Sequence, residues 1–138
     1  MAFDPFVSFA PGRVCLFGEH QDYLGLPVIA AAIPLGCRLV VRPRADGVWS
    51  FQTPKLGFSW TCHVNDAVSQ VPEREPGPGA FLRAGLAEAL AAGWDVGCGA
   101  EVVAHVDLPV QAGLSSSSAM VVAWVNAFAR VAGVRLTS

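Results

Sequence analysis

The sequence has few charged residues. Only 14% of its 138 residues are Asp, Glu, Lys or Arg, whereas an ordinary soluble domain carries about 25%. The nine basic and eleven acidic residues leave a formal net charge of -2, and the sequence pI is about 5.8. Proteins that bind nucleic acid or anionic lipid present basic patches that attract phosphate. We therefore expect no nucleic-acid partner.

The sequence also lacks a long uninterrupted hydrophobic run. Its longest nearly apolar stretch, residues 26–37, contains Pro27, Pro34 and Gly36 and is shorter than the roughly 20 residues that span a bilayer. The first residues have neither the basic start nor the apolar centre of a secretory signal. We therefore expect a cytoplasmic protein with no membrane partner.

Closely spaced cysteines are missing as well. The four cysteines form no CxxC pair of the kind that binds zinc, and their wide spacing is unlike a small disulfide framework; they are Cys15, Cys37, Cys62 and Cys98. Free cysteines behave as small hydrophobic residues and are often buried. We expect buried thiols here.

What the sequence has instead is hydrophobic residues, at 53% of the chain, arranged in short periodic segments. Residues 6–18 contain two β-like runs joined at Pro11-Gly12, which predicts a strand, a turn and a strand. Further strands are predicted over 36–42 and 101–108. Residues 47–63 alternate and are punctuated by Pro54 and Gly57, which predicts a β-hairpin.

Two helices complete the predicted elements. Apolar residues recur at helical spacing over 80–92, before Gly93 as a C-terminal stop, and again over 119–131. Residues 71–79 hold three prolines and two glycines and are predicted to be a loop, as is the connection 109–118. The length supports one domain with its own core over residues 1–138.

The end of the sequence indicates a longer protein. Thr137 and Ser138 follow a helix and the Gly133 stop, and hydroxyl residues of this kind normally cap the start of a further helix. A missing packing partner would also account for the high apolar content. We therefore expect that the chain is the front part of something longer.

One segment, residues 108–119, joins a predicted strand to a predicted helix through Gly113 and four serines. Unpaired N–H groups at a helix N-terminus carry the positive end of the dipole and bind phosphate. Gly113 lets the backbone approach such an anion, and a serine hydroxyl can ligate Mg²⁺ beside a nucleotide. An ordinary N-cap in a serine-rich linker explains the same residues equally well.

Three common catalytic or nucleotide motifs are absent. Ser115 has Gly113 two residues before it but Ser117 two residues after it, so the Gly-x-Ser-x-Gly elbow of the hydrolases is missing. The GxGxxG fingerprint and the GxxxxGK[ST] loop are missing too. These absences argue against a serine hydrolase, an ordinary Rossmann domain and a Walker-type nucleotide site.

A second segment, residues 10–25, gathers polar side chains in an otherwise apolar sequence. They are Arg13, Glu19, His20, Asp22 and Tyr23. Carboxylates and an imidazole on a glycine-flanked loop can hold the hydroxyl groups of a polyol, and Arg13 can stabilise a phosphate or a deprotonated hydroxyl. A solvated loop is the alternative. His63 and His105 have no comparable neighbours and are interpreted as structural.

Together the two segments resemble motifs of the GHMP kinases, a family that includes galactokinase, homoserine, mevalonate and phosphomevalonate kinases. Residues 11–25, PGRVCLFGEHQDYLG, are similar to the galactokinase signature PGRVNLIGEHTDYNGG, and residues 109–119 are similar to the phosphate loop PxGxGLSSSA. Their order and separation also fit. The resemblance covers nearly the whole chain and implies the family's N-terminal domain, a two-layer α+β sandwich like that of a ribosomal small-subunit protein, without the C-terminal domain.

The resemblance implies a role for each matched residue. Arg13 would assist the acceptor hydroxyl as the catalytic residue, and ATP phosphates and Mg²⁺ would lie at the serine segment with Ser117 as the metal ligand. The sugar would be surrounded by Glu19, His20, Asp22 and Tyr23. The ATP phosphates would be cradled by Gly113, Leu114, Ser115, Ser116, Ser117 and Ser118.

The sequence departs from the family pattern at four positions: Cys15 replaces Asn, Gln21 replaces Thr, Gln111 replaces a small residue and Ser118 replaces Ala. In the family, the catalytic aspartate and a third motif lie downstream of the phosphate loop. The 138 residues alone are therefore expected to lack the full catalytic apparatus and to need the C-terminal half or a complementing chain.

Two hypotheses about function stand on these residues. The first is the N-terminal part of an ATP- and Mg²⁺-dependent kinase that transfers the γ-phosphoryl group to a sugar hydroxyl. The second is a non-catalytic sugar- or nucleotide-binding module, or an inactive kinase fragment. RNA binding by analogy with ribosomal relatives of the fold rests on fold alone and conflicts with the acidic pI.

Overall fold

The structure is a computed structural model that describes residues 4–69, 77–109 and 114–137. It forms a five-stranded sheet in the order β1-β2-β5-β3-β4. The strands are β1 (Phe6–Phe17), β2 (Ile29–Pro43), β3 (Val48–Thr53), β4 (Phe58–His63) and β5 (Gly99–Val106), and the helices are α1 (Asp66–Ser69), α2 (Pro78–Ala91) and α3 (Ser116–Val131). Short 3-10 turns lie at η1 (Asp22–Leu24) and η2 (Pro54–Leu56).

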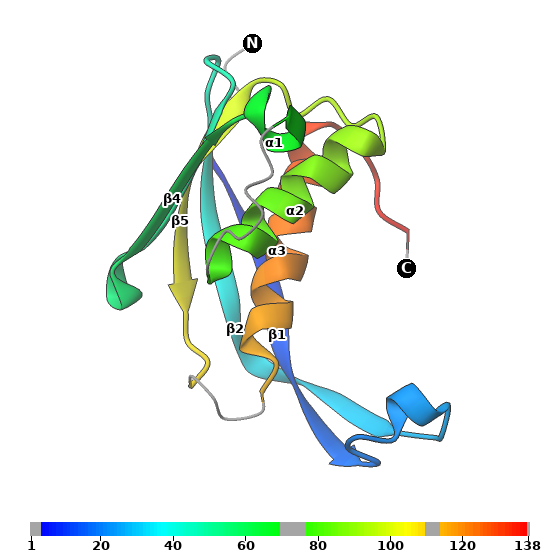
Figure 1. Ribbon diagram of the computed structural model, residues 1–138. Helices are drawn as coiled ribbons and strands as arrows, with labels where there is room; N and C mark the ends of the chain where they lie inside the picture. The colour runs from blue at the N-terminus through cyan, green and yellow to red at the C-terminus, as the bar shows by residue number, and fades with distance from the viewer. Residues whose placement is uncertain (1–3, 70–76, 110–113, 138) are drawn as a thin grey trace.

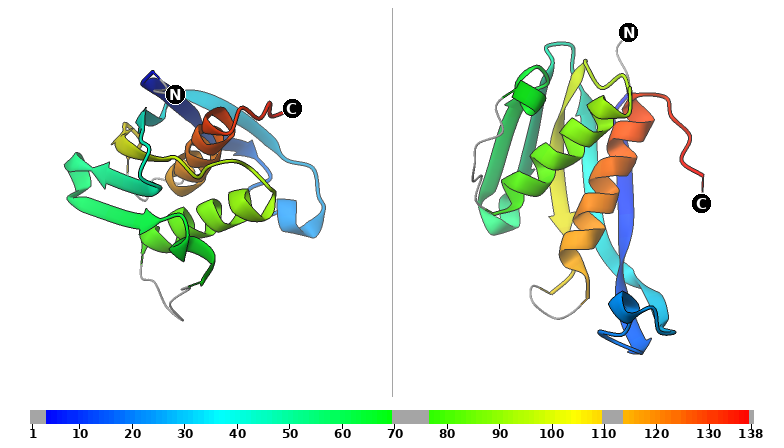
Figure 2. Two further views of the ribbon diagram at one scale, coloured as in Figure 1. Left: turned by 90° about the horizontal axis from the view of Figure 1, so that it is seen from above. Right: turned by 45° about the vertical axis from the view of Figure 1, so that its right-hand side comes forward.

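Helices α2 and α3 lie side by side against one face of the sheet, which gives two layers (Figures 1 and 2). The β3–β5 pair is parallel, and the other strand pairs are antiparallel. This arrangement confirms the α+β two-layer prediction. Across the described residues no helix is both long and apolar enough to cross a membrane.

An aromatic cluster between the two layers forms the centre of the core. The indole of Trp124, on α3, lies edge-on to Trp49 and Phe51, each at 5.4 Å between ring centroids, and to Phe128 at 4.6 Å. Its Nε1–H donates to the carbonyl of Leu82 at 3.1 Å. Since edge-to-face rings add to the energy of area burial, this cluster holds α2 and α3 on the sheet.

The hairpin and both longer helices were predicted correctly. Strands β3 and β4 pair antiparallel from Val48–His63 to Thr53–Phe58. Helix α2 begins two residues before the predicted start, because Pro78 stands in its first turn, where a missing N–H costs nothing. Helix α3 begins at Ser116 rather than at 119, so three of the serines assigned to a linker are helical.

The predicted turn at Pro11-Gly12 is wrong, because β1 continues through these residues to Phe17. The register with β2 shifts between Pro11 and Arg13, so the irregularity is absorbed without a reversal of the chain. Proline is tolerated there because β1 is an edge strand with one neighbour. Strand β2 begins at Ile29, well before the predicted residue 36, because it pairs with this longer β1.

Two other predictions have a mixed outcome. Most of the predicted loop 71–79 lies outside the described residues, and its last two residues begin α2. All four cysteines are thiols outside any disulfide, as expected, but only Cys37 and Cys62 are buried, while Cys15 and Cys98 are partly exposed.

Candidate functional site

The end of β1, the beginning of β2 and the loop between them leave the two-layer body and form an arm, residues 13–32. The arm projects beyond the start of α3, at the lower right of Figure 1. Its register pairs Arg13 with Ala32 and Cys15 with Ala30. Since side chains alternate along a strand, Arg13, Cys15 and Ala30 share one face of the arm.

The loop at the tip of the arm is held by its own backbone. The N–H of Gln21 donates to the carbonyl of Gly18 at 3.0 Å, and the N–H of Leu26 donates to the carbonyl of Gln21 at 3.1 Å. Gly18 has φ +84°, and a Cβ there would lie 2.7 Å from the carbonyl oxygen of Pro27. Only glycine therefore allows the chain to fold back so closely at the start of the loop.

This loop and one face of the arm line an open polar cavity of about 430 Å³, and most of its lining residues are exposed. The volume is in the range of small-molecule sites. The five polar residues that the sequence singled out all line it. The lining is Arg13, Cys15, Gly18, Glu19, His20, Asp22, Tyr23, Val28 and Ala30. The structure thus brings together a guanidinium, two carboxylates, an imidazole and a phenol, and adds Cys15, Val28 and Ala30, which sequence reasoning did not assign.

The serine segment forms the beginning of α3. The first helical hydrogen bond there runs from the N–H of Ala119 to the carbonyl of Ser115, at 2.9 Å. The N–H groups of Ser116, Ser117 and Ser118 precede it and have no partner within the helix, as at any helix start. No acidic side chain stands in the first turn. Leu114 to Ser116 are partly buried, Ser117 and Ser118 are exposed, and Gly113 lies outside the described residues.

Ser115 does not act as the N-cap that the alternative interpretation of the serine segment requires. Its side chain makes no capping hydrogen bond within the described residues, and its backbone is left-handed, with φ +57°. Among the described residues only one other non-glycine residue, His20, has a positive φ, at +62°. Such conformations cost about 1–3 kcal/mol and gather at functional sites. Each of the two segments therefore carries one strained residue.

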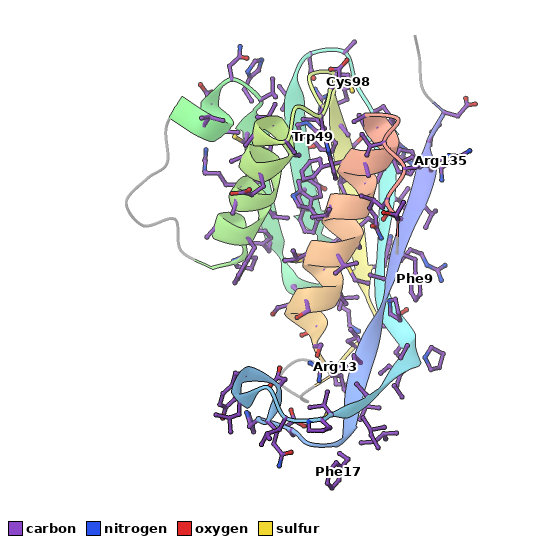
Figure 3. All side chains as sticks on the ribbon, turned by 90° about the vertical axis from the view of Figure 1, so that its right-hand side faces the viewer. Phe9, Arg13, Phe17, Trp49, Cys98 and Arg135 are labelled. Carbon is purple, nitrogen blue, oxygen red and sulfur yellow. The ribbon has the colours of Figure 1, made fainter. Side chains whose placement is uncertain are left out.

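A direct contact joins the two segments. The backbone N–H of Arg13 donates to the carbonyl of Leu114 at 3.2 Å, and Figure 3 shows Arg13 where the arm meets the beginning of α3. Gly12 makes this approach possible, because a Cβ there would lie 2.5 Å from Leu108 Cδ2 and 2.9 Å from the carbonyl oxygen of Leu114. The polar cavity and the start of α3 are therefore neighbours.

An apolar cavity of about 590 Å³ lies on the other side of the serine segment, where α2 and α3 begin. Sequence reasoning missed it, because its walls come from four separate parts of the chain. The lining is Leu56, Gly77, Pro78, Ala80, Phe81, Val106, Ser116, Ser117 and Met120. Ser116 and Ser117, the first two residues of α3, thus line this apolar cavity.

The described residues include no group of three or more His, Cys, Asp or Glu side chains that could hold a metal ion. A metal at this site would therefore depend on few protein ligands. That condition suits Mg²⁺, which usually binds one or two protein groups together with phosphate oxygens and water. Ser117, exposed in the first turn of α3, offers a hydroxyl of this kind.

Two protein-family models match the parts of the chain that contain the two segments. The galactokinase galactose-binding signature matches residues 2–43, and the GHMP kinases N-terminal domain matches residues 81–138. A galactokinase of Exiguobacterium sibiricum is 33% identical over 118 residues, 81% of this chain and 28% of that protein. A mevalonate kinase of Candida albicans is 46% identical over 59 residues, 41% of this chain and 14% of that protein.

The fold agrees as well. The crystal structure of Lactococcus lactis galactokinase complexed with galactose superposes with a TM-score of 0.83 at 24% identity, covering 99% of this chain and 35% of that one. This chain thus spans about a third or less of the length of these galactokinases. On the two matched domain models and these relatives, the chain belongs to the GHMP kinase family and has the fold of that family's N-terminal domain.

Proposed function

We propose that this chain is the acceptor- and phosphate-binding part of an ATP-dependent small-molecule kinase that phosphorylates a sugar hydroxyl, as galactokinases do. The observation that carries the proposal is the 3.2 Å hydrogen bond from the Arg13 N–H to the Leu114 carbonyl. It sets a cavity suited to a polyol against a helix start suited to phosphate. Phosphoryl transfer is catalysed mainly by positioning and charge stabilisation, which need this proximity.

The polar cavity is assigned to the sugar. Ionised Glu19 and Asp22 accept hydrogen bonds from hydroxyl groups, and Arg13 donates them. Both carboxylates and the guanidinium line the cavity, so a polyol can be held by paired polar contacts that fix its orientation. Arg13 also places a permanent positive charge where the attacking hydroxyl loses its proton, and we assign it the catalytic role. Glu19, His20, Asp22 and Tyr23 are assigned to binding.

The start of α3 and the apolar cavity are assigned to ATP. The free N–H groups and hydroxyls of residues 114–118 suit the phosphates, and the apolar cavity beside Ser116 and Ser117 suits the flat, weakly polar base. Gly113, outside the described residues, belongs to the same proposed loop. When bound, ATP supplies the phosphoryl group, and Mg²⁺ neutralises phosphate charge with the Ser117 hydroxyl as its ligand from this chain.

The rest of the catalytic apparatus is assigned to the remaining length of the enzyme. Because this chain spans 28% of the E. sibiricum galactokinase, we propose that the base for the hydroxyl proton comes from the C-terminal part or from a complementing chain. A non-catalytic sugar- or nucleotide-binding module is the second candidate, since the polar cavity and the start of α3 would bind the same two ligands in it.

Two variants that act on opposite ends of the site test the proposal. In calorimetric titrations of the 138-residue chain, Asp22→Ala should weaken D-galactose binding at least tenfold and leave Mg²⁺-ATP binding within twofold. Ser117→Ala should do the reverse, because its hydroxyl lies on the phosphate side. A wild-type chain that binds neither ligand would contradict the proposal. So would a Ser117→Ala variant with a lower unfolding temperature and unchanged nucleotide affinity, since the hydroxyl would then have only a structural role at the helix start.

A further inference from the structure

Two walls of the polar cavity differ in chemistry. One is the loop wall, with Glu19, His20, Asp22 and Tyr23. The other is the strand wall, where β1 and β2 contribute Cys15 and Ala30, with Val28 just before β2. Arg13 stands at the inner end of the strand wall. From the sequence, Cys15 is only a departure from the galactokinase signature, but the structure makes it part of the cavity.

Cys15 and Ala30 are direct cross-strand partners, so their β-carbons lie about 4.5–5.5 Å apart on one face. Alanine and valine side chains form no hydrogen bonds. The thiol of Cys15 donates to the carbonyl of Phe17 at 3.2 Å, so its proton is used within its own strand. A thiol sulfur is also a weak acceptor. Beyond Arg13, at its inner end, the strand wall therefore offers a ligand almost no hydrogen bonding.

We infer that Cys15 contacts the bound acceptor and is a specificity-determining residue, because it forms with Val28 and Ala30 a wall that accepts C–H groups and rejects a hydroxyl group. This inference rests on the proposed function, since it takes the polar cavity as the acceptor site. A hydroxyl turned toward this wall would exchange water contacts for apolar side chains and gain no hydrogen-bond partner, which disfavours its binding there. The acceptor is therefore a polyol with hydroxyls toward the loop and a hydroxyl-free side toward the strands.

The contact can be measured by the alkylation of Cys15, without catalysis. Cys15 and Cys98 are the two partly exposed thiols, whereas Cys37 and Cys62 are buried. Burial, together with the charge of Asp107, raises the pKa of Cys37 to about 11, so this thiol stays protonated and unreactive near pH 8. Cys98 is the control, because it lies at the opposite end of the molecule from the arm (Figure 3). Burial raises the pKa of the Cys98 thiol, so each cysteine is compared only with itself, with and without the sugar.

The 138-residue chain is treated with iodoacetamide at pH 8, with and without D-galactose, and each cysteine is followed by peptide mass spectrometry. Saturation-transfer NMR on the same samples reports whether the sugar binds. We expect galactose to slow alkylation of Cys15 at least fivefold and to leave the rate at Cys98 unchanged. Sugar binding with no protection of Cys15 would overturn the inference and leave the proposed function intact. No binding by either method would overturn both.

Specificity is measured with monodeoxy sugars. For the wild-type chain, at least one of 2-, 3-, 4- and 6-deoxygalactose should bind within threefold of galactose, because the hydroxyl it lacks would face the strand wall. Cys15→Asn adds a donor and an acceptor to that wall and should make the same deoxy sugar bind about tenfold worse than galactose. Cys98→Ser should leave the order of the sugar affinities as it is in the wild-type chain. If the wild-type chain binds every deoxy sugar with an affinity more than threefold lower than its affinity for galactose, the inference is wrong.

Discussion

The two-layer body and the arm belong to one sheet but bury their residues differently. In the body half of β1, residues 6–10 alternate regularly between buried and exposed, whereas from Arg13 onward no residue of β1 is buried. The large side chains of the body, such as Trp49 and Trp124, are fully buried. Those of the arm, such as Leu16 and Phe17, are 66% and 64% exposed.

This difference in burial indicates that the residues of the body and those of the arm serve different purposes. The body is specified by a buried core that packs within this chain, although some of its apolar side chains, such as Phe9 and Phe81, are exposed as well. The arm carries the polar cavity on one face and exposed apolar side chains elsewhere, and neither is explained by packing within the described residues. We therefore expect substitutions in the body to change stability, and substitutions in the arm to change binding and association.

The largest effect should come from the core of the body. Trp124→Ala removes four aromatic contacts and the hydrogen bond to Leu82, and should lower the free energy of unfolding by about 3–5 kcal/mol. In the arm, Phe17→Ala should change it by less than about 0.5 kcal/mol, because the ring is exposed. Urea unfolding of both variants measures this. Similar decreases in the free energy of unfolding of the two variants would refute the distinction between body and arm.

An intermediate effect is expected where the arm joins the body. Gly12→Ala places a Cβ against Leu108 and the Leu114 carbonyl, and should cost about 1–3 kcal/mol by overpacking. It should also weaken Mg²⁺-ATP binding, because Leu114 leads into the serine segment. Gly97→Ala is the control, since its Cβ would meet only Asp95 Oδ1, at an ordinary 3.5 Å. Equal behaviour of the two variants in unfolding and titration would argue against the close junction.

The smallest effect on stability, with a clear effect on association, is expected at the apolar side chains of the arm. The wild-type 138-residue chain should self-associate, because association would remove these exposed apolar side chains from water. Leu16→Ser combined with Phe17→Ser should reduce this association and change the free energy of unfolding by less than about 0.5 kcal/mol. Val68→Ser, at a side chain 63% exposed on α1, should leave it unchanged. Sedimentation velocity decides, and a monomeric wild-type chain would contradict the prediction.

The elements of the body could be predicted because their signals are local. Helices α2 and α3 follow from apolar spacing, and the β3–β4 hairpin follows from alternation around Pro54 and Gly57. The arm could be predicted only in part, because residues 13–17 were correctly predicted as a strand but the first half of β2 was not. Its strands lack alternating burial, and the pairing of Cys15 with Ala30 depends on a register that no local pattern encodes.

The residues of the candidate site also fall into two groups, those that local sequence signals reveal and those that only the fold brings together. Arg13, Glu19, His20, Asp22 and Tyr23 were found from the sequence because polar residues are rare in this chain and these lie within eleven positions. Cys15 could have been found as the residue two after Arg13, on the same face of a strand. Val28 and Ala30 required β2, and the apolar cavity beside Ser116 required residues as distant as Leu56 and Phe81.

We have proposed that the two segments form one site, in which the sugar and the nucleotide lie next to each other. Paramagnetic relaxation can detect this proximity. Mn²⁺ and a non-hydrolysable ATP analogue are added to the 138-residue chain with D-galactose, and the relaxation of the sugar protons is measured by NMR. We predict strong broadening of the galactose signals with the wild-type chain, and recovery of narrow signals with Ser117→Ala. Galactose that binds the wild-type chain without any broadening would contradict the claim.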